Sequence, residues 1–210
     1  MSRARALIAL IAVAALAAAL LAGLDSATRE RIATNEARRL IANIQAVLPP
    51  GFDNEPHRDQ ALLSAPEALG TDEALPVFRA RRGGEPAGLA MTVVAPDGYV
   101  DAIRLLIGLD ANDTVTGVRA ISHSETPGLG DGIDVDRSDW ILAFNGRRAD
   151  AAASEWGLRR DAGEFDQLTG ATITSRAVLN AVRRALQFYT QNRTELYALP
   201  SVHPDTSHDD

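Results

Sequence analysis

Residues 75–122, LPVFRARRGGEPAGLAMTVVAPDGYVDAIRLLIGLDANDTVTGVRAIS, decide the fold of this chain. Apolar and β-branched residues dominate four runs, which predict strands at residues 75–81, 88–94, 99–109 and 114–122. The turns between these runs are short and contain glycine, proline, asparagine or aspartate, at residues 83–84, 96–98 and 112–113. Parallel strands need crossovers of a dozen or more residues, so we expect an antiparallel meander. This argues against a doubly wound nucleotide-binding fold.

The chain begins with a candidate membrane anchor. Residues 6–24 are 19 consecutive positions without a polar side chain. At about 1.5 Å per residue they form about 28 Å of helix, close to the roughly 30 Å hydrocarbon thickness of a bilayer. Arg3 and Arg5 precede this run whereas Asp25 and Glu30 follow it, so the positive-inside rule leaves the N-terminus in the cytoplasm. A cleaved signal peptide is the alternative, but the run exceeds the roughly 7–15 apolar residues usual there, and we favour an anchor. Either interpretation exports the rest of the chain.

Helical patterns flank the predicted sheet. Ser26 or Thr28 can cap a helix that two prolines end at residues 49–50, and we expect this helix to continue or closely follow the apolar one. A last helix follows residue 175. Apolar residues recur at helical spacing in both, namely Ile32, Leu40, Ile41, Ile44, Val47 and Leu48 in the first and Val178, Leu179, Val182, Leu186 and Tyr189 in the last. We expect a loop with one short helix at residues 51–71, helix or strand at residues 140–144, and the start of a helix at residues 150–157.

The composition excludes several functions. The formal net charge is −7, with 28 acidic residues against 21 basic ones, all of them arginine. Such a surface repels phosphate backbones, so nucleic-acid binding is not expected. The absence of cysteine excludes disulfides, thiolate-ligated zinc, iron–sulfur clusters and thiol catalysis. No Ser/His/Asp arrangement or carboxylate pair suggests hydrolysis, and we assign no catalytic or metal-ligating residue. Redox chemistry would need an organic cofactor or a metal bound without thiolates.

A glycine-rich loop, HSETPGLGD at residues 123–131, directly follows the last predicted strand. Glycine lets backbone amides approach a ligand closely, and Pro127-Gly128 favours a type II turn. The spacing differs from a dinucleotide fingerprint, and no helix follows at once. Two interpretations stay open from the residues alone: a connector with a solvated acid, or a ligand-binding loop.

A second candidate segment, DQLTGATITS at residues 166–175, precedes the last predicted helix. Four hydroxyl groups surround its Gly-Ala turn, those of Thr169, Thr172, Thr174 and Ser175. Free N–H groups and the helix dipole favour an anion such as phosphate at this position. Simple N-capping by Thr174 or Ser175 is the alternative, and it needs only one hydroxyl. No P-loop lysine is present, so nucleotide hydrolysis is not expected.

With these motifs the chain resembles the G subunit of the Rnf ion-translocating electron-transport complex, a family related to the C subunit of the sodium-translocating NADH:quinone reductase. The resemblance covers nearly the whole chain and rests on the N-terminal apolar helix and on APDGY at residues 95–99, HSETPGLGD at 123–131, SDW at 138–140 and FDQLTGATITS at 165–175. It implies an α+β fold, in which one N-terminal transmembrane helix precedes an FMN-binding domain whose twisted antiparallel sheet packs against helices. We place the cytoplasmic N-terminus and anchor at residues 1–24, a helical and loop connector at 25–74, the FMN-binding domain at 75–199 and a polar tail at 200–210.

The resemblance also implies a covalent cofactor. In the family's flavinylation motif, FMN is joined through its phosphate to the threonine that ends Thr-Gly-Ala-Thr, which is Thr172 here. A phosphodiester would keep one negative charge beside the last helix, and FMN would perform the redox chemistry. A flavin transferase would install it, with Asp166 helping this enzyme to recognise the site. The cofactor-binding residues implied are Thr172, Thr169, Gly170, Ala171, Thr174, Glu125, Thr126, Leu129 and Gly130.

The function implied by the resemblance is electron transport. The chain would be a redox subunit of a ferredoxin:NAD oxidoreductase complex, anchored in the bacterial inner membrane with its domain in the periplasm. Its partners would be the other membrane and iron–sulfur subunits, and it would have no small-molecule substrate of its own. Two alternatives stay open: a flavinylated subunit of a different exported redox chain, and a non-redox, membrane-tethered periplasmic binding or scaffold module.

Overall fold

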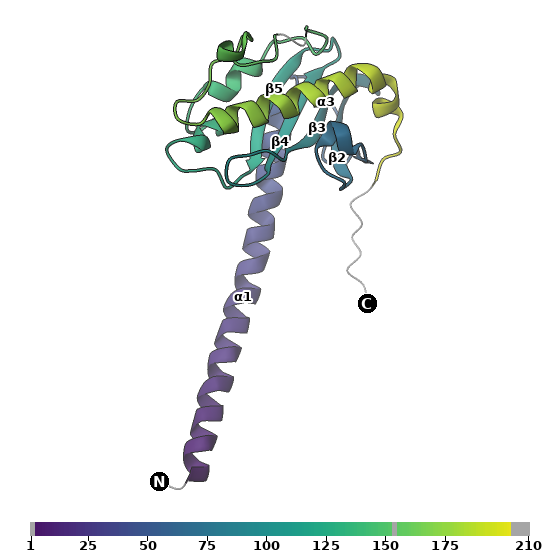
Figure 1. The fold of residues 1–210 in the computed structure, drawn as a ribbon. Coiled ribbons are helices and arrows are strands. Elements are labelled where there is room, and N and C mark those ends of the chain that lie inside the picture. Colours follow the sequence, from purple (N-terminus) through teal and green to yellow (C-terminus); the bar gives the residue numbers. More distant parts are fainter. Residues whose placement is uncertain (1–2, 153–154, 203–210) are drawn as a thin grey trace. The chain divides into compact units, whose positions relative to one another are not determined.

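The computed structural model describes residues 3–152 and 155–202, which divide into two compact units between Ile41 and Ala42. The first unit is the N-terminal part of helix α1 (Arg3–Val47). The second unit contains the end of α1 and all other elements (Figure 1). These are strands β1 (Gln60–Leu63), β2 (Leu75–Arg82), β3 (Glu85–Ala95), β4 (Ile103–Asp110) and β5 (Val115–Ser122), helices α2 (Pro66–Leu69) and α3 (Thr172–Ala198), and the 3₁₀ helices η1 (Gly130–Ile133), η2 (Trp140–Phe144) and η3 (Arg159–Asp161).

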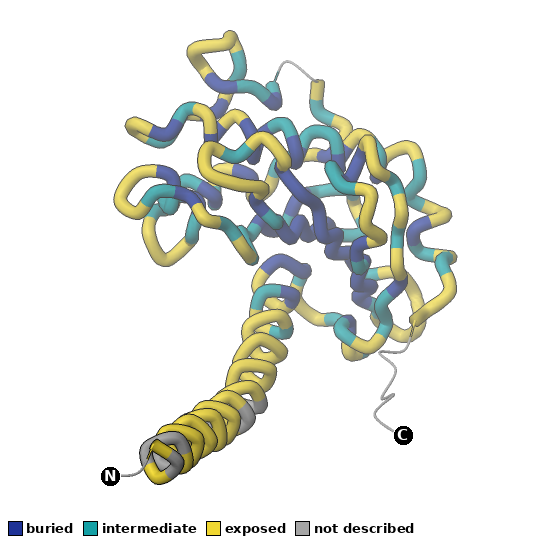
Figure 2. The backbone as a smooth tube through the Cα atoms, turned by 60° about the horizontal axis from the view of Figure 1, so that its bottom comes forward, coloured by how far each residue is buried: buried dark blue, intermediate teal, exposed yellow. Residues whose placement is uncertain are grey.

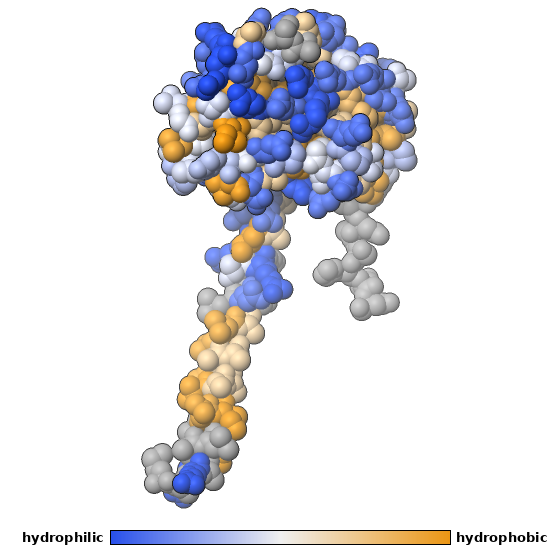
Figure 3. All heavy atoms as spheres, viewed as in Figure 1, coloured by the Kyte–Doolittle hydropathy of each residue, from blue (hydrophilic) through white to orange (hydrophobic). Residues whose placement is uncertain are grey.

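Helix α1 is continuous, because no glycine or proline interrupts residues 24–47. The cap expected at Ser26 or Thr28 is wrong, because both residues lie inside α1. The expected continuation of the apolar helix and its end before the two prolines are confirmed. In the first unit, apolar side chains such as Ile11, Leu16 and Leu21 are exposed. Figure 3 shows orange, hydrophobic atoms along this part of the helix. Within the described residues, α1 is the one helix that is long and apolar enough to cross a membrane, judged by length and composition.

The sheet is the predicted meander. Its strand order β1-β2-β3-β4-β5 follows the sequence, and every neighbouring pair is antiparallel. Strand β1 is not visible in the sequence pattern, because its four residues are too few to show a period. It forms by pairing with β2, with Gln60 opposite Phe78. Helix α2 confirms the short helix expected between residues 51 and 71.

Strand β4 begins at Ile103, later than predicted from residue 99. The Val100 N–H donates to Glu125 Oε1 at 3.2 Å, and the Ala102 N–H donates to Asp101 Oδ1 at 2.7 Å. These amides are therefore not available for a strand ladder, and residues 99–102 belong to the connection between β3 and β4.

One face of the sheet packs against α3, which crosses the strands in Figure 1. The apolar stripe predicted for this helix is buried and joins side chains of β2 to β5 in the main core, seen as the dark blue segments of Figure 2. Its members are Val178, Leu179, Val182, Leu186 and Tyr189. The stripe fixes the rotation of α3 and so the direction of its first turn.

The opposite face of the sheet receives the last turn of α1. Cross-strand neighbours Phe78, Ala90, Gly108 and Gly117 form a row of decreasing size from β2 to β5. Val47 lies over the glycine end of this row. A Cβ on Gly108 would come 1.9 Å from the Val47 carbonyl oxygen, and a Cβ on Gly117 would come 2.9 Å from the Val47 Cα. The two glycines thus leave the space that the end of α1 fills.

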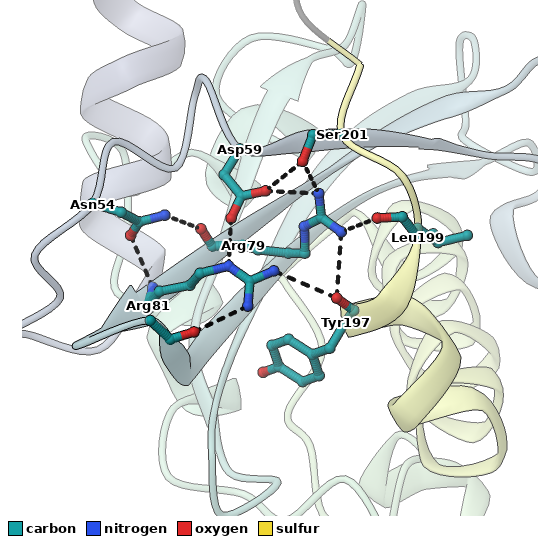
Figure 4. A network of polar contacts seen from close by, with 8 residues as sticks. Asn54, Asp59, Arg79, Arg81, Tyr197, Leu199 and Ser201 are labelled. Atoms are coloured by element: carbon teal, nitrogen blue, oxygen red, sulfur yellow. Dashed lines mark hydrogen bonds and ion pairs between the residues drawn. The ribbon is translucent and has the colours of Figure 1, made fainter.

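Arg79 of β2 is buried beneath the C-terminal segment (Figure 4). Its Nη2 pairs with Asp59 Oδ1 at 2.7 Å and donates to Ser201 Oγ at 2.6 Å. Its Nη1 donates to the carbonyl groups of Tyr197 and Leu199. This network fastens the chain after α3 to the sheet.

The predicted polar tail therefore starts as an ordered segment. The Val202 N–H donates to the Gln60 carbonyl oxygen at 2.8 Å, which adds a backbone contact at the edge strand β1. The rest of the tail, from residue 203 to residue 210, lies outside the described residues.

The long segment between β5 and α3 has little regular structure. Residues 140–144, for which helix or strand was open, form the 3₁₀ helix η2. Phe144 of this helix packs on Trp156 and Phe165, with ring centroids 6.2 and 4.8 Å apart, so Trp156 belongs to the core. The helix start expected at residues 150–157 falls partly on residues 153–154, outside the described residues, and the flanking positions form turns and bends.

Candidate functional site

A pocket of about 430 Å³ opens between three segments that are far apart in the sequence. They are the turn between β3 and β4, the loop after β5, and the start of α3. The lining residues are Tyr99, Glu125, Thr126, Leu129, Gly130, Gly170, Ala171, Thr172, Ile173 and Thr174. All the cofactor-binding residues expected from the sequence line this pocket except Thr169, which is exposed in the turn before α3. Their contact with a cofactor stays a prediction.

Helix α3 begins at Thr172 without a side-chain cap. Its N-cap residue is Ala171, and no side chain makes a capping hydrogen bond. Ser175 donates to the Ala171 carbonyl at 2.9 Å, and Thr174 donates to Glu125 Oε2 at 2.5 Å. The capping interpretation for these two hydroxyls is therefore wrong. The N–H groups of the first turn stay available for an anion.

A sharp turn brings Thr172 to the pocket. Gly170 has φ +76°, a left-handed conformation that favours glycine, and a Cβ at this position would come 2.9 Å from Leu129 Cδ2. Thr172 follows as the first residue of α3, with a half-buried side chain. Its hydroxyl donates to Oε1 of the exposed Gln167 at 3.2 Å. This hydroxyl therefore combines access from the cavity with the positive end of a helix dipole.

The pocket wall contains a buried carboxylate. Glu125 is 4% exposed, and its Oε2 and Oε1 accept hydrogen bonds from the Thr174 hydroxyl at 2.5 Å and the Val100 N–H at 3.2 Å. Two glycines make room for it, because a Cβ on Gly98 or Gly130 would come 2.9 or 2.8 Å from a carboxylate oxygen. Both glycines thus leave room for Glu125, and Gly98 also makes room for the Asp101 carbonyl oxygen, 1.9 Å from an added Cβ.

Polar contacts hold the loop after β5 in shape. The Glu125 N–H donates to His123 Nδ1 at 3.2 Å, and His123 Nε2 lies 3.1 Å from Asp134 Oδ2. Because Nδ1 accepts, Nε2 carries the proton and donates to Asp134. The Gly128 N–H donates to Asp131 Oδ1 at 2.7 Å. The loop is thus braced by its own polar side chains on the side of Glu125.

The SDW motif connects this loop with the segment before α3. The Ser138 hydroxyl donates to the Gly132 carbonyl at 2.6 Å, and the Trp140 indole N–H donates to the Asp166 carbonyl at 2.5 Å. The motif therefore holds the two candidate segments together. This role could not be predicted from the sequence, because Trp140 reaches its hydrogen-bond partner only in the folded chain.

Two lining residues are missing from the expected cofactor-binding set, Tyr99 and Ile173. They are large and exposed, with 64% and 51% of their surface accessible, and Leu129 beside them is 46% exposed. Apolar side chains grouped at a pocket indicate a surface that a ligand or partner covers. The sequence signal for Tyr99 is its place in the APDGY motif, directly after the turn predicted at residues 96–98. Ile173 carries no comparable signal.

Comparison with known proteins supports a flavin site. Residues 98–187, which include every lining residue of the pocket, match the family model of the FMN-binding domain. The chain is similar to the G subunit of the ion-translocating oxidoreductase complex of Vibrio atlanticus strain LGP32, with 43% identity over 175 residues, 82% of this chain and 83% of the relative. The corresponding protein of Shewanella oneidensis MR-1 is 38% identical over 198 residues, which cover 93% of each chain.

Proposed function

The chain belongs to the family of G subunits of ion-translocating oxidoreductase complexes, and from this premise we propose that it carries FMN bound covalently through its phosphate to Thr172. It is a membrane-anchored electron-transport subunit with an FMN-binding domain. The relatives are subunits of oxidoreductase complexes, which favours this function over a non-redox scaffold module. FMN would supply the electron chemistry, and the protein would bind and orient it.

The observation that carries the proposal is the position of Thr172. Its hydroxyl belongs to the pocket and to the first residue of α3. A phosphodiester on this oxygen keeps a negative charge next to uncapped helix N–H groups, which interact favourably with it. Covalent attachment also retains the cofactor in a compartment without a supply of free flavin.

The remaining pocket residues would hold FMN without covalent bonds. We propose contacts from Glu125, Thr126, Leu129 and Gly130 on one wall and from Gly170, Ala171 and Thr174 on the other. Thr169 would act through the turn that precedes Thr172.

Attachment requires a modifying enzyme. We propose a flavin transferase that uses an activated flavin nucleotide, whose phosphoanhydride bond breaks as the bond from Thr172 Oγ to phosphorus forms and the hydroxyl proton leaves. Asp166 is exposed and could be recognised by this enzyme. The product is heavier than the unmodified chain by one FMN less one water.

The orientation across the membrane is also part of the proposal. Arg3 and Arg5 precede the apolar run, which places the N-terminus in the cytoplasm and the FMN domain in the periplasm of a bacterial inner membrane. Its partners would be the other membrane and iron–sulfur subunits of the complex.

Intact mass and flavin fluorescence after denaturation test the proposal. We expect the full chain, co-expressed with a flavin transferase, to gain one FMN less one water and to fluoresce in a denaturing gel. Thr172→Ala should lose both signals completely, because it removes the oxygen that bonds the phosphorus in this proposal. Thr194→Ala removes the same group from an exposed position near the other end of α3 and should keep both. Fluorescence retained by Thr172→Ala would contradict the attachment site.

A further inference from the structure

Two charged side chains are buried in the described part of the domain, and only one of them has an oppositely charged partner. Arg79 and Glu125 are the only charged side chains that are buried in the described parts of the chain. Arg79 has a counter-ion, Asp59, at 2.7 Å. Glu125 has only neutral donors, the Thr174 hydroxyl and the Val100 N–H, and it forms no ion pair with any described residue.

A buried carboxylate without a cation lowers stability. Glutamine would fill the same volume and keep both hydrogen bonds, because its oxygen can accept from the Val100 N–H and its NH₂ can donate to the Thr174 hydroxyl. Packing and hydrogen bonding therefore do not explain a charged group at residue 125. The position of the charge does: Glu125 lines the pocket.

The first turn of α3 lies beside this carboxylate. Its donor Thr174 lies in the first turn of α3, where the positive end of the helix dipole favours negative charge. The same helix end would hold the phosphodiester on Thr172. The pocket thus has a positive end for the phosphate and a negative wall at Glu125.

We propose that Glu125 lowers the reduction potential of the bound flavin; this inference rests on the proposed function. Two-electron reduction adds two electrons from a redox partner and one proton from solvent to the oxidised ring, so the reduced ring carries one more negative charge. A fixed carboxylate in a poorly solvated pocket repels that charge and favours the oxidised form. Glu125 therefore acts on the reduction potential through its negative charge.

Potentiometric titration of the flavin-loaded full chain tests this inference. Glu125→Gln should shift the equilibrium constant for reduction at least tenfold toward the reduced flavin, which raises the midpoint potential by about 30 mV for a two-electron couple. Glu85→Gln makes the same change in net charge at an exposed residue at the start of β3 and should leave the potential unchanged. Equal potentials for wild type and Glu125→Gln would overturn the inference.

A second variant and the loading assay keep the two proposals separate. Glu125→Met is neutral and of similar length, so it should raise the potential in the same direction if the glutamine variant does not load. Loading is measured first, by mass and fluorescence. A wild-type chain without covalent FMN contradicts the attachment proposal, whereas a loaded chain whose potential ignores the charge at residue 125 contradicts only the inference about Glu125.

Discussion

Arg79 is the largest side chain that the domain buries completely, and Asp59 balances its charge. Burial opposes ionisation of Asp59, but hydrogen bonds from Arg81 and Ser201 and the charges of Arg79 and Arg81 outweigh it, so the pKa of Asp59 lies below its usual value. A lowered pKa means that the folded state favours the ionised carboxylate. The stability contributed by Asp59 is therefore present above the unfolded pKa, about 3.9, and is lost as the pH falls through the folded value.

We expect Asp59→Asn to lower the free energy of unfolding at pH 7 by about 2–3 kcal/mol, because it leaves a buried guanidinium without its counter-ion. This is less than for a fully buried pair, since the Asp59 side chain is 18% exposed. The difference from wild type should shrink as the pH falls below about 4. Denaturant unfolding at several pH values measures both effects.

The matched control is Asp161→Asn, which breaks an exposed pair with Arg176. It should cost less than about 1 kcal/mol. If the two variants lose equal stability, Asp59 does not compensate a buried charge.

Thr172 and Glu125 show how far single residues in the site could be predicted. The motif around Thr172 is continuous in the sequence, so the position of Thr172 at the start of a helix can be predicted from the sequence. The hydrogen bond from Thr174 to Glu125 joins residues 49 positions apart, and no local pattern reveals it. The capping interpretation is wrong because the Thr174 hydroxyl makes this tertiary contact, whereas the Ser175 hydroxyl donates to the Ala171 carbonyl four residues earlier.

Among the elements, α1 has two different parts. Its N-terminal half contains the apolar run with exposed side chains such as Ile11 and Leu16, whereas its last turn belongs to the core of the second unit. The row that ends in Gly108 and Gly117 provides the space for this turn. Glycine weakens an isolated strand, so its presence in the middle of two paired strands has a packing reason.

Gly108→Ala should therefore destabilise the second unit strongly. Its Cβ would meet the Val47 carbonyl oxygen at 1.9 Å, and moving the end of α1 should cost about 3 kcal/mol, or about 10 °C in melting temperature. Gly83→Ala is the control, because no atom lies near its Cβ and only its φ of +58° is unfavourable. That variant should cost about 1 kcal/mol. Equal melting temperatures for the two variants would show that the end of α1 can move away from residue 108 without loss of stability.

The strands illustrate what element prediction from sequence can and cannot reach. Short turns predict β2 to β5 as a meander, since chain connectivity alone requires antiparallel neighbours. Strand β1 could not be predicted, because its four residues show no strand pattern and the strand is defined only by its pairing with β2. The start of β4 was predicted too early because hydrogen bonds from Val100 and Ala102 to side-chain carboxylates use those amides.

In the whole molecule, the boundary between anchor and domain falls within α1. A fragment of residues 26–210 keeps the last turn of α1 and should be soluble and monomeric. A fragment of residues 50–210 uncovers Phe78, Ala90 and Leu106, which lie in the core cluster of that turn, and should bind a hydrophobic dye and aggregate. Size-exclusion chromatography and dye fluorescence distinguish the two. Monomeric behaviour of the shorter fragment would show that the last turn of α1 is dispensable.

The separation of the two pocket walls along the chain has a consequence for the order of events during synthesis. Each strand of the meander pairs with the strand made just before it, so the sheet can grow as the polypeptide emerges. The second wall of the pocket exists only after α3 has followed, and the segment that covers Arg79 comes later still. A chain whose synthesis stops before residue 172 has the sheet but lacks the second wall of the pocket. Bound FMN would therefore mark a chain whose synthesis has proceeded beyond the start of α3.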